Sequence, residues 1–464
     1  MADDRYAELD RLIEERLTAW TDELAQFCRF GSEEGDVEAL RAAADWTAER
    51  LRAAGAEVRV IDLPDRPDVA PLVVGEIGDG PRTVNLVQHY DVQPAVPLEL
   101  WETPPYEPDI RDGRLYGRGA TDNKGEFLPR VWAVEAYRES IGELPVRIRF
   151  LVEGEEESGS PSLNALLDRA PELREADAAL IEGGGLTPDD KPEIAGGGRG
   201  IIVIRLHVRT IAYDAHSSAA VILPNAAVRM AQALASMYTP DGLPAVDGLD
   251  VGIRPPTQAQ LDVVANMPLS RLDDDRREYG VDRFIGGRDG REALHAMTFA
   301  PTLNVQGLWS GFIGEGDKTI TPAEADARLD IRIVPDQVPE EVVHAVRRHL
   351  ANAGFGDVEV KLEEAEPAWW TPPDHPLIDA AARASEAVAH KPTIRRVSMA
   401  GTVPMHQVCA EHGVPATLLG AGRDDCRAHA PNENVRIDDL GTAARIMARF
   451  IDELAALPEV PRVA

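Results

Sequence analysis

Cysteine is scarce in this chain, which has only three in 464 residues. Cys28, Cys409 and Cys426 are odd in number and widely spaced, so they predict reduced thiols and exclude a disulfide-stapled secreted domain. Long apolar runs are also missing, both at the N-terminus, where a signal segment would lie, and elsewhere, since a membrane-spanning helix needs about 20 apolar residues. We therefore expect a cytoplasmic protein that does not engage a membrane.

Positive charge is in short supply as well. Lys and Arg number 48 against 80 Asp and Glu, which leaves a formal net charge of −32. A negative surface of this size disfavours nucleic acids and anionic membranes as partners. The composition is otherwise that of a globular protein, and the length exceeds what one hydrophobic core usually serves, so two domains are expected.

Helical and strand-like segments alternate along the first part of the chain. Apolar residues at helical spacing or in short β-branched runs define them. The predicted helices are 4–27, 36–54, 123–140 and 162–169. The predicted strands are 57–62, 71–77, 83–88, 145–153 and 178–182. This alternation predicts an α/β domain with a central mixed sheet flanked by helices.

The pattern changes after the glycine-rich run Gly196–Gly200. If the polar stretch 239–300 is an insertion, the order that follows is β-α-β-β-α-β, the ferredoxin-like α+β sandwich. Its first helix is predicted over 224–238, with Pro224 in the first turn. The α/β pattern then resumes, so one discontinuous catalytic domain is interrupted by a lid or dimerisation domain. The expected boundaries are 1–199 and 364–464 for the first domain and 200–363 for the second.

The strand 145–153 runs directly into the acidic segment Glu153–Ser160. Carboxylates are rarely buried unless they are paired or hold a metal, so a core strand that ends in glutamates is unusual. The ordinary alternative is a solvated acidic turn. However, open α/β sheets place their sites at the ends of core strands, which favours a functional role here.

Further polar residues follow other predicted strands. Asp91 lies two residues after His89, on the same face of an extended segment, so its carboxylate can reach the imidazole and fix its tautomer. Asp122 follows a glycine-rich loop that lacks Walker spacing, and a simple helix N-cap is the alternative for it. Together with Glu182, His429 and the acidic segment, these residues suit two zinc-like ions that share a carboxylate, with another glutamate as general base.

Five motifs, taken together, are specific. They are His89–Pro94, Leu115–Gly119, Asp122–Gly125, Glu153–Ser160 and His429–Glu433. With them the sequence resembles, over nearly its whole length, the di-metal peptidase and deacylase family. That family includes glutamate carboxypeptidase, carnosinase-type dipeptidases, aminoacylase, acetylornithine deacetylase and succinyl-diaminopimelate desuccinylase. The similarity is greatest to the carnosinase-like dipeptidase branch.

The resemblance implies a centre of two divalent metal ions, with zinc the first candidate and manganese or cobalt the alternatives. Asp122 would bridge the two ions. His89 and Glu182 would complete one site, and Glu157 and His429 would complete the other.

The same resemblance implies roles for the neighbours of these ligands. Glu156 would be the general base, and Asp91 would support the catalytic centre through His89. The peptide bond Asp122–Asn123 would be cis. Within the acidic segment, Glu155 is expected to be solvated and Glu153 to be structural.

The second domain carries the implied substrate contacts. His216 would stabilise the tetrahedral oxyanion and Thr319 would contact substrate, each reaching the active site of a partner subunit, so a homodimer is expected. Arg332 would clamp a substrate carboxylate, for which a surface ion pair is the alternative. Thr402 would bind the same carboxylate, and Asn304 would line the site.

We therefore expect a dipeptidase or small exopeptidase that cleaves an amide bond next to a free carboxylate. The alternative substrate is an N-acyl amino acid, because the position of Glu182 commonly holds aspartate in the family's peptidases and glutamate in its deacylases. A catalytically dead relative that serves as a binding or scaffold protein is a third possibility. Competent residues at every implied metal and base position argue against it.

Overall fold

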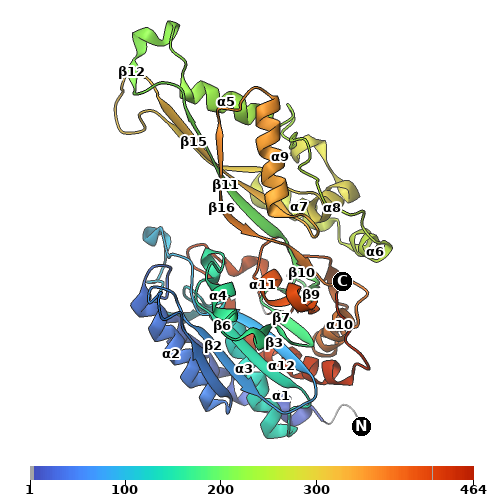
Figure 1. The fold of residues 1–464 in the computed structure, drawn as a ribbon. Coiled ribbons are helices and arrows are strands. Elements are labelled where there is room, and N and C mark those ends of the chain that lie inside the picture. The colour runs from blue at the N-terminus through green and yellow to red at the C-terminus, as the bar shows by residue number, and fades with distance from the viewer. Residues whose placement is uncertain (1–4, 421, 464) are drawn as a thin grey trace. The chain divides into compact units, whose positions relative to one another are not determined.

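The computed structural model describes residues 5–420 and 422–463. The chain forms two compact units, each built around its own sheet (Figure 1). The first unit runs to Gly197 and resumes over Trp370–Met399 and from Val403 onward. The second unit comprises Gly198–Trp369 and Ala400–Thr402. The predicted α/β class, with a central mixed sheet flanked by helices, is confirmed.

A nine-stranded mixed sheet forms the centre of the first unit. In spatial order its strands are β1 (Glu57–Ile61), β2 (Leu72–Ile77), β6 (Arg147–Glu153), β3 (Thr83–His89), β7 (Ala178–Ile181), β19 (Ala416–Leu418), β9 (Pro192–Ala195) and β18 (Ile394–Arg396), with β8 (Gly185–Leu186) paired to β9. Strand β3 runs parallel to both β6 and β7, so the carboxyl ends of all three meet at one edge of the sheet.

Helices cover this sheet, and the longer ones are α1 (Ala7–Cys28), α2 (Val37–Ala53), α3 (Lys124–Ser140), α10 (Pro376–Ala389) and α12 (Ile437–Ala456). Helix α3 packs against α1 and α12, and at the first of these contacts Trp20 stacks on Trp132 with ring centroids 5.1 Å apart. The described helices include none that is both long and apolar enough to cross a membrane. All three cysteines are free thiols, as expected.

A small three-stranded sheet lies beside the main one in the same unit. Its strands are β4 (Asp109–Arg111), β5 (Arg114–Tyr116) and β20 (Asn434–Arg436). The pairing of Asn434 with Tyr116 brings together two loops that are far apart in the sequence. One loop leads to Asp122, and the other carries His429.

The second unit has an antiparallel four-stranded sheet with the connections of the ferredoxin-like sandwich. Its elements in chain order are β11 (Gly200–Arg209), α5 (Ala226–Ser236), β13 (Asn304–Ser310), β15 (Glu324–Ile333), α9 (Pro339–Asn352) and β16 (Glu359–Glu366). The spatial order is β13-β15-β11-β16, and α5 and α9 lie on the same face (Figure 1).

Two features of this unit refine the expectations from sequence. The polar stretch 239–300 contains three helices, α6 (Gln258–Asn266), α7 (Ser270–Tyr279) and α8 (Gly290–Phe299). The placement of Pro224 in the first turn of its helix was wrong. Helix α5 begins only at Ala226, because the side chain of Asn225 caps the first turn by accepting hydrogen bonds from two backbone N–H groups.

Candidate metal centre

The implied ligands all lie at strand ends or in adjoining loops of the first unit. His89 is the last residue of β3, Glu182 follows β7, and Glu157 lies in a 3-10 turn (η2, Glu156–Ser158) shortly after β6. Asp122 precedes α3, and His429 lies in the loop before β20. Because β3, β6 and β7 are parallel, their ends deliver three of these side chains to the same edge of the sheet.

Three of the residues form what we call the buried cluster: His89, Asp122 and Glu182. The Nε2 atom of His89 lies 2.9 Å from Glu182 Oε2 and 3.1 Å from Asp122 Oδ1. Its Nδ1 atom lies 3.1 Å from the main-chain oxygen of Asp91 and 3.2 Å from Asp91 Oδ1. With Nδ1–H donating to Asp91, Nε2 is left as the nitrogen that can ligate a metal.

The open cluster consists of Asp122, Glu157 and His429. The Nε2 atom of His429 lies 3.0 Å from Asp122 Oδ2 and 3.3 Å from Glu157 Oε2. Asp122 therefore faces one cluster with Oδ1 and the other with Oδ2. In each cluster the candidate ligand atoms lie within 4.8 Å of one another. The peptide bond Asp122–Asn123 is cis, as the resemblance implied.

Glu156 lies beside the buried cluster but belongs to neither. Its Oε2 atom is 3.9 Å from His89 Nε2, beyond hydrogen-bond reach. Burial raises the pKa of Glu156 well above its ordinary value, and the charge of Glu182 adds to this effect. Burial acts on Asp122 in the same direction, but hydrogen bonds from His429 and His89 outweigh it and lower the pKa of Asp122.

The rest of the acidic segment is more enclosed than expected. Glu153 is buried and accepts a hydrogen bond from Ser160 Oγ at 2.8 Å. The expectation that Glu155 is solvated was wrong. This side chain is only partly exposed, with Oε2 shielded from solvent and Oε1 3.4 Å from the N–H of Ala70, because the segment leading into β2 lies against it.

Sequence reasoning missed several residues that hold the ligands in place. Gln93 donates from Nε2 to Glu157 Oε2 at 3.0 Å. On α3, Glu126 accepts from the N–H of Gly183 at 2.9 Å, and Arg130 donates to the carbonyl of Ile181 at 2.8 Å. These two hydrogen bonds hold the backbone in place on either side of Glu182. Contacts of this kind have no periodicity in sequence that would reveal them.

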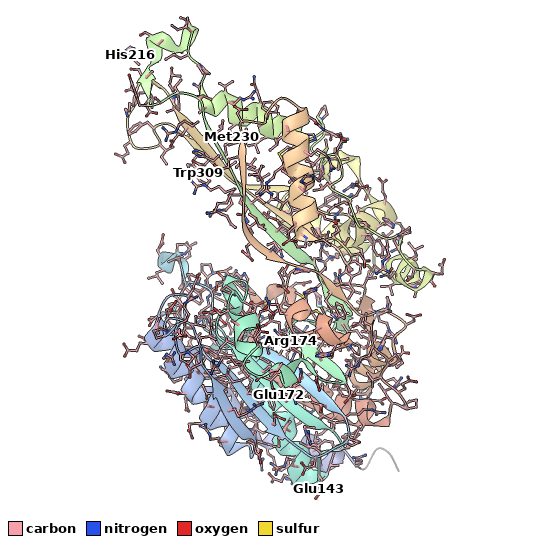
Figure 2. All side chains as sticks on the ribbon, in the orientation of Figure 1. Glu143, Glu172, Arg174, His216, Met230 and Trp309 are labelled. Carbon is pink, nitrogen blue, oxygen red and sulfur yellow. The ribbon has the colours of Figure 1, made fainter. Side chains whose placement is uncertain are left out.

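The implied substrate residues of the second unit come together as two pairs. His216 is exposed at one end of the unit (Figure 2), and the next residue, Ser217, donates its N–H to the carbonyl of Thr319 at 3.0 Å. Arg332 donates from Nη1 to Thr402 Oγ1 at 2.6 Å. Asn304 lies on β13, where its side chain donates to Asp330 Oδ2 at 2.7 Å.

Comparison with known proteins gives a consistent result. The family model of Peptidase family M20/M25/M40 matches residues 86–453. The chain is 28% identical over 434 residues to the Cys-Gly metallodipeptidase dug1 of Schizosaccharomyces pombe, covering 89% of this chain and 90% of the relative. It is 29% identical over 429 residues to the Beta-Ala-His dipeptidase of Homo sapiens, covering 88% and 84%.

A solved structure, the M20 family metallo-carboxypeptidase Sso-CP2 from Sulfolobus solfataricus, matches with a TM-score of 0.87 at 28% identity, covering 94% of this chain and 99% of that one. The match to the family model spans well over half of the chain, and the relatives align over most of their own length. The resemblance found from the motifs is thus confirmed, and the chain belongs to Peptidase family M20/M25/M40 as an enzyme of the metallopeptidase class.

Proposed function

We propose that this enzyme is a dipeptidase or small exopeptidase that cleaves an amide bond next to a free carboxylate with the help of two metal ions. The observation that carries the proposal is that two ligand clusters share Asp122, with Glu156 beside them but in neither. The dipeptidase names of two relatives support the substrate class.

The donor set suits two divalent ions. Each cluster offers one imidazole nitrogen and two carboxylate oxygens, and the two clusters meet at the two oxygens of Asp122. Zinc is the first candidate for such mixed nitrogen and oxygen ligands, and manganese or cobalt are alternatives. When bound, two such ions supply Lewis-acid chemistry, because they polarise an amide carbonyl and make a water molecule more acidic.

Glu156 then acts as the proton carrier. It accepts the proton of the attacking water and passes it to the nitrogen of the leaving amine. In the metal-free protein burial raises the pKa of Glu156, and a higher pKa makes a carboxylate a stronger base. Asp91 keeps the His89 imidazole in one orientation throughout, through the contacts at Nδ1.

Arg332 and Thr402 bind the substrate carboxylate. The Nη1 atom of Arg332 donates to Thr402 Oγ1, and the carboxylates of Asp330 and Glu364 act on its guanidinium as neighbouring charges. The side chain is partly buried, and burial lowers its pKa, although the guanidinium stays charged. The planar guanidinium of Arg332 and the adjacent hydroxyl of Thr402 can both donate hydrogen bonds to a carboxylate.

A second copy of the chain completes the site through the region of His216 and Thr319. Three aliphatic side chains of this region, Val221, Ile222 and Ile313, are 89%, 81% and 82% exposed. Ile313 also lines a cavity of about 380 Å³, together with Tyr213 and Trp309. Exposed apolar groups at this density favour a protein partner. Light scattering should give the mass of a dimer, and a monomer would contradict this part of the proposal.

The alternative function is deacylation of N-acyl amino acids, which the glutamate at position 182 favours. Purified enzyme loaded with zinc, manganese or cobalt should be assayed on matched pairs such as Ala-Leu and N-acetyl-Leu, and on Ala-Leu-amide. We expect the dipeptide to turn over fastest and the amide at least about 100-fold more slowly, because the amide lacks the carboxylate.

Faster turnover of the acyl substrate would replace the proposal with its alternative. A fully loaded protein that turns over neither substrate would revive the scaffold interpretation. The three free thiols support a cytoplasmic location for the enzyme.

A further inference from the structure

Glu433 is a fully buried carboxylate whose two oxygens are both engaged. Oε1 accepts hydrogen bonds from the N–H groups of Thr121 and Asp122, each at 2.9 Å. Oε2 accepts from the N–H of Gly119 at 2.9 Å and from Arg118 Nη1 at 2.7 Å. One side chain therefore holds three main-chain N–H groups of the loop that carries the shared carboxylate.

The backbone around Glu433 reinforces this link. Its carbonyl accepts from the N–H of Gly117 at 3.0 Å, and the next residue, Asn434, pairs with Tyr116. His429 lies on the same segment a few residues earlier. The loop that delivers the histidine of the open cluster and the loop that delivers Asp122 are thus fastened to each other at Glu433.

A buried ion pair needs hydrogen bonds to its remaining lone pairs, and Glu433 takes these from the main chain of one loop. The side chain of Arg118 is 1% exposed, and that of Glu433 is fully enclosed. The three N–H contacts go beyond charge neutralisation, because they fix the direction in which the backbone presents Asp122. A carboxylate that must face two clusters depends on that direction more than any other ligand.

We infer that Glu433 is a positioning residue, which sets Asp122 between the two clusters and ties it to the loop of His429. This inference rests on the metal centre proposed above. Contacts that orient metal ligands are typically worth about 10- to 100-fold in metal affinity or activity. The loss of Glu433 should therefore weaken both metal sites together, although Glu433 touches no substrate and no ion.

The decisive variant is Glu433→Gln, which keeps the size of the side chain. The amide of glutamine has only one acceptor oxygen. Its NH₂ group is a donor and cannot accept hydrogen bonds from the N–H groups that it would face. Cobalt(II) is the probe, with affinity measured by competition with a chelator and geometry by the visible absorption spectrum. We expect affinity to fall about 10- to 100-fold at both sites, with an altered spectrum.

Asp452→Asn is the matched control. Asp452 also accepts hydrogen bonds from several side chains, Tyr6, Tyr137 and Arg5 among them, but none of these partners belongs to the clusters or their loops. This variant should lose stability and keep the cobalt affinity and spectrum of the natural enzyme. Glu433→Asp keeps the charge but is one methylene too short to reach all three N–H groups, so an intermediate affinity is expected.

Folded Glu433→Gln protein with unchanged affinity and spectrum would overturn the inference while leaving the metal centre intact. If that variant fails to fold, Glu433→Asp decides the question, since natural affinity in a folded aspartate variant would overturn the inference equally. A natural enzyme that binds no cobalt would overturn the metal centre itself, and this inference with it.

Discussion

The two ligand clusters share one carboxylate but differ in how the protein encloses them. In the buried cluster the His89 side chain is 0% exposed and that of Glu182 is 12% exposed. In the open cluster the His429 side chain is 56% exposed, although Glu157 beside it is 5% exposed. The sheet itself places His89 and Glu182, whereas His429 depends on a loop and on the contacts that hold it.

The two clusters also separate the two adjacent glutamates of the acidic segment. Glu156 and Glu157 are neighbours in one 3-10 turn, yet Glu157 faces the exposed histidine and Glu156 faces the buried one. Both carboxyl groups are largely enclosed, with Glu157 5% and Glu156 14% exposed, and burial raises the pKa of each. The two neighbours therefore differ in the histidine that they face and not in their own enclosure.

The largest effect is expected for Glu156→Gln. The amide cannot accept a proton, so turnover should fall by about 10²–10⁴-fold while both metal sites stay filled. Steady-state kinetics and metal analysis on the same sample would check this. Glu157→Gln is the matched partner, since it should lose metal from the open cluster. Near-normal turnover in Glu156→Gln would contradict the assignment of Glu156 as the base.

Replacing each histidine by alanine tests whether the buried histidine contributes more to stability than the exposed one. In the metal-free protein the pKa of His89 is well above its ordinary value despite burial, because the carboxylates of Glu182, Asp122 and Asp91 raise it. His89→Ala leaves the partly enclosed carboxylates of Glu182 and Asp122 without this cationic partner and should cost about 3 kcal/mol of stability. His429→Ala removes an exposed group and should cost less than about 1 kcal/mol, while one metal site is lost. Denaturant unfolding and metal stoichiometry would measure both, and equal destabilisation would contradict the distinction.

Part of the candidate centre could be predicted from sequence, because His89 ends β3 and Glu182 directly follows β7. The strand predicted at 145–153 is observed at Arg147–Glu153, and the residues that follow such strands are easy to identify. The contacts of Glu433 and the burial of Glu155 could not be predicted, because they depend on which loop lies against which. A readable signal was overlooked in the insertion, where Thr257 and Gln260 form the capping box that starts α6.

Asp91→Asn tests the support common to both clusters. Asp91 contacts His89 Nδ1, and its Oδ2 also accepts from the N–H of Glu157 at 2.9 Å. Loss of the carboxylate should weaken metal binding or activity by about 10- to 100-fold, with an effect on each cluster. Metal titration resolves the two sites. A change confined to one of them would mean that Asp91 serves only that cluster.

Metal affinity should fall as pH falls. In the metal-free protein, hydrogen bonds to Asp122 and Glu157 raise the pKa of His429 to about 10, so a metal must displace a proton that is bound at neutral pH. Each displaced proton makes affinity about tenfold weaker per unit of decreasing pH. Calorimetry in buffers of different ionisation enthalpy would count the protons. His429→Ala, which loses the open site, should release fewer protons, and His412→Ala, at a histidine outside both clusters, should release the natural number.

Gln93→Met should give the smallest effect and the most selective one. The Gln93 amide donates to Glu157 Oε2, and its backbone N–H, which the substitution keeps, donates to Oε1 at 3.2 Å. The substitution removes this bond and a second one from Nε2 to the main-chain oxygen of Glu157 at 3.2 Å, so affinity at the open cluster should drop about tenfold, while the buried cluster is unchanged. A two-site cobalt titration measures both constants. Equal weakening at both sites would show that the clusters respond as one unit, and that the enclosure of His89 does not insulate its metal from changes around Glu157.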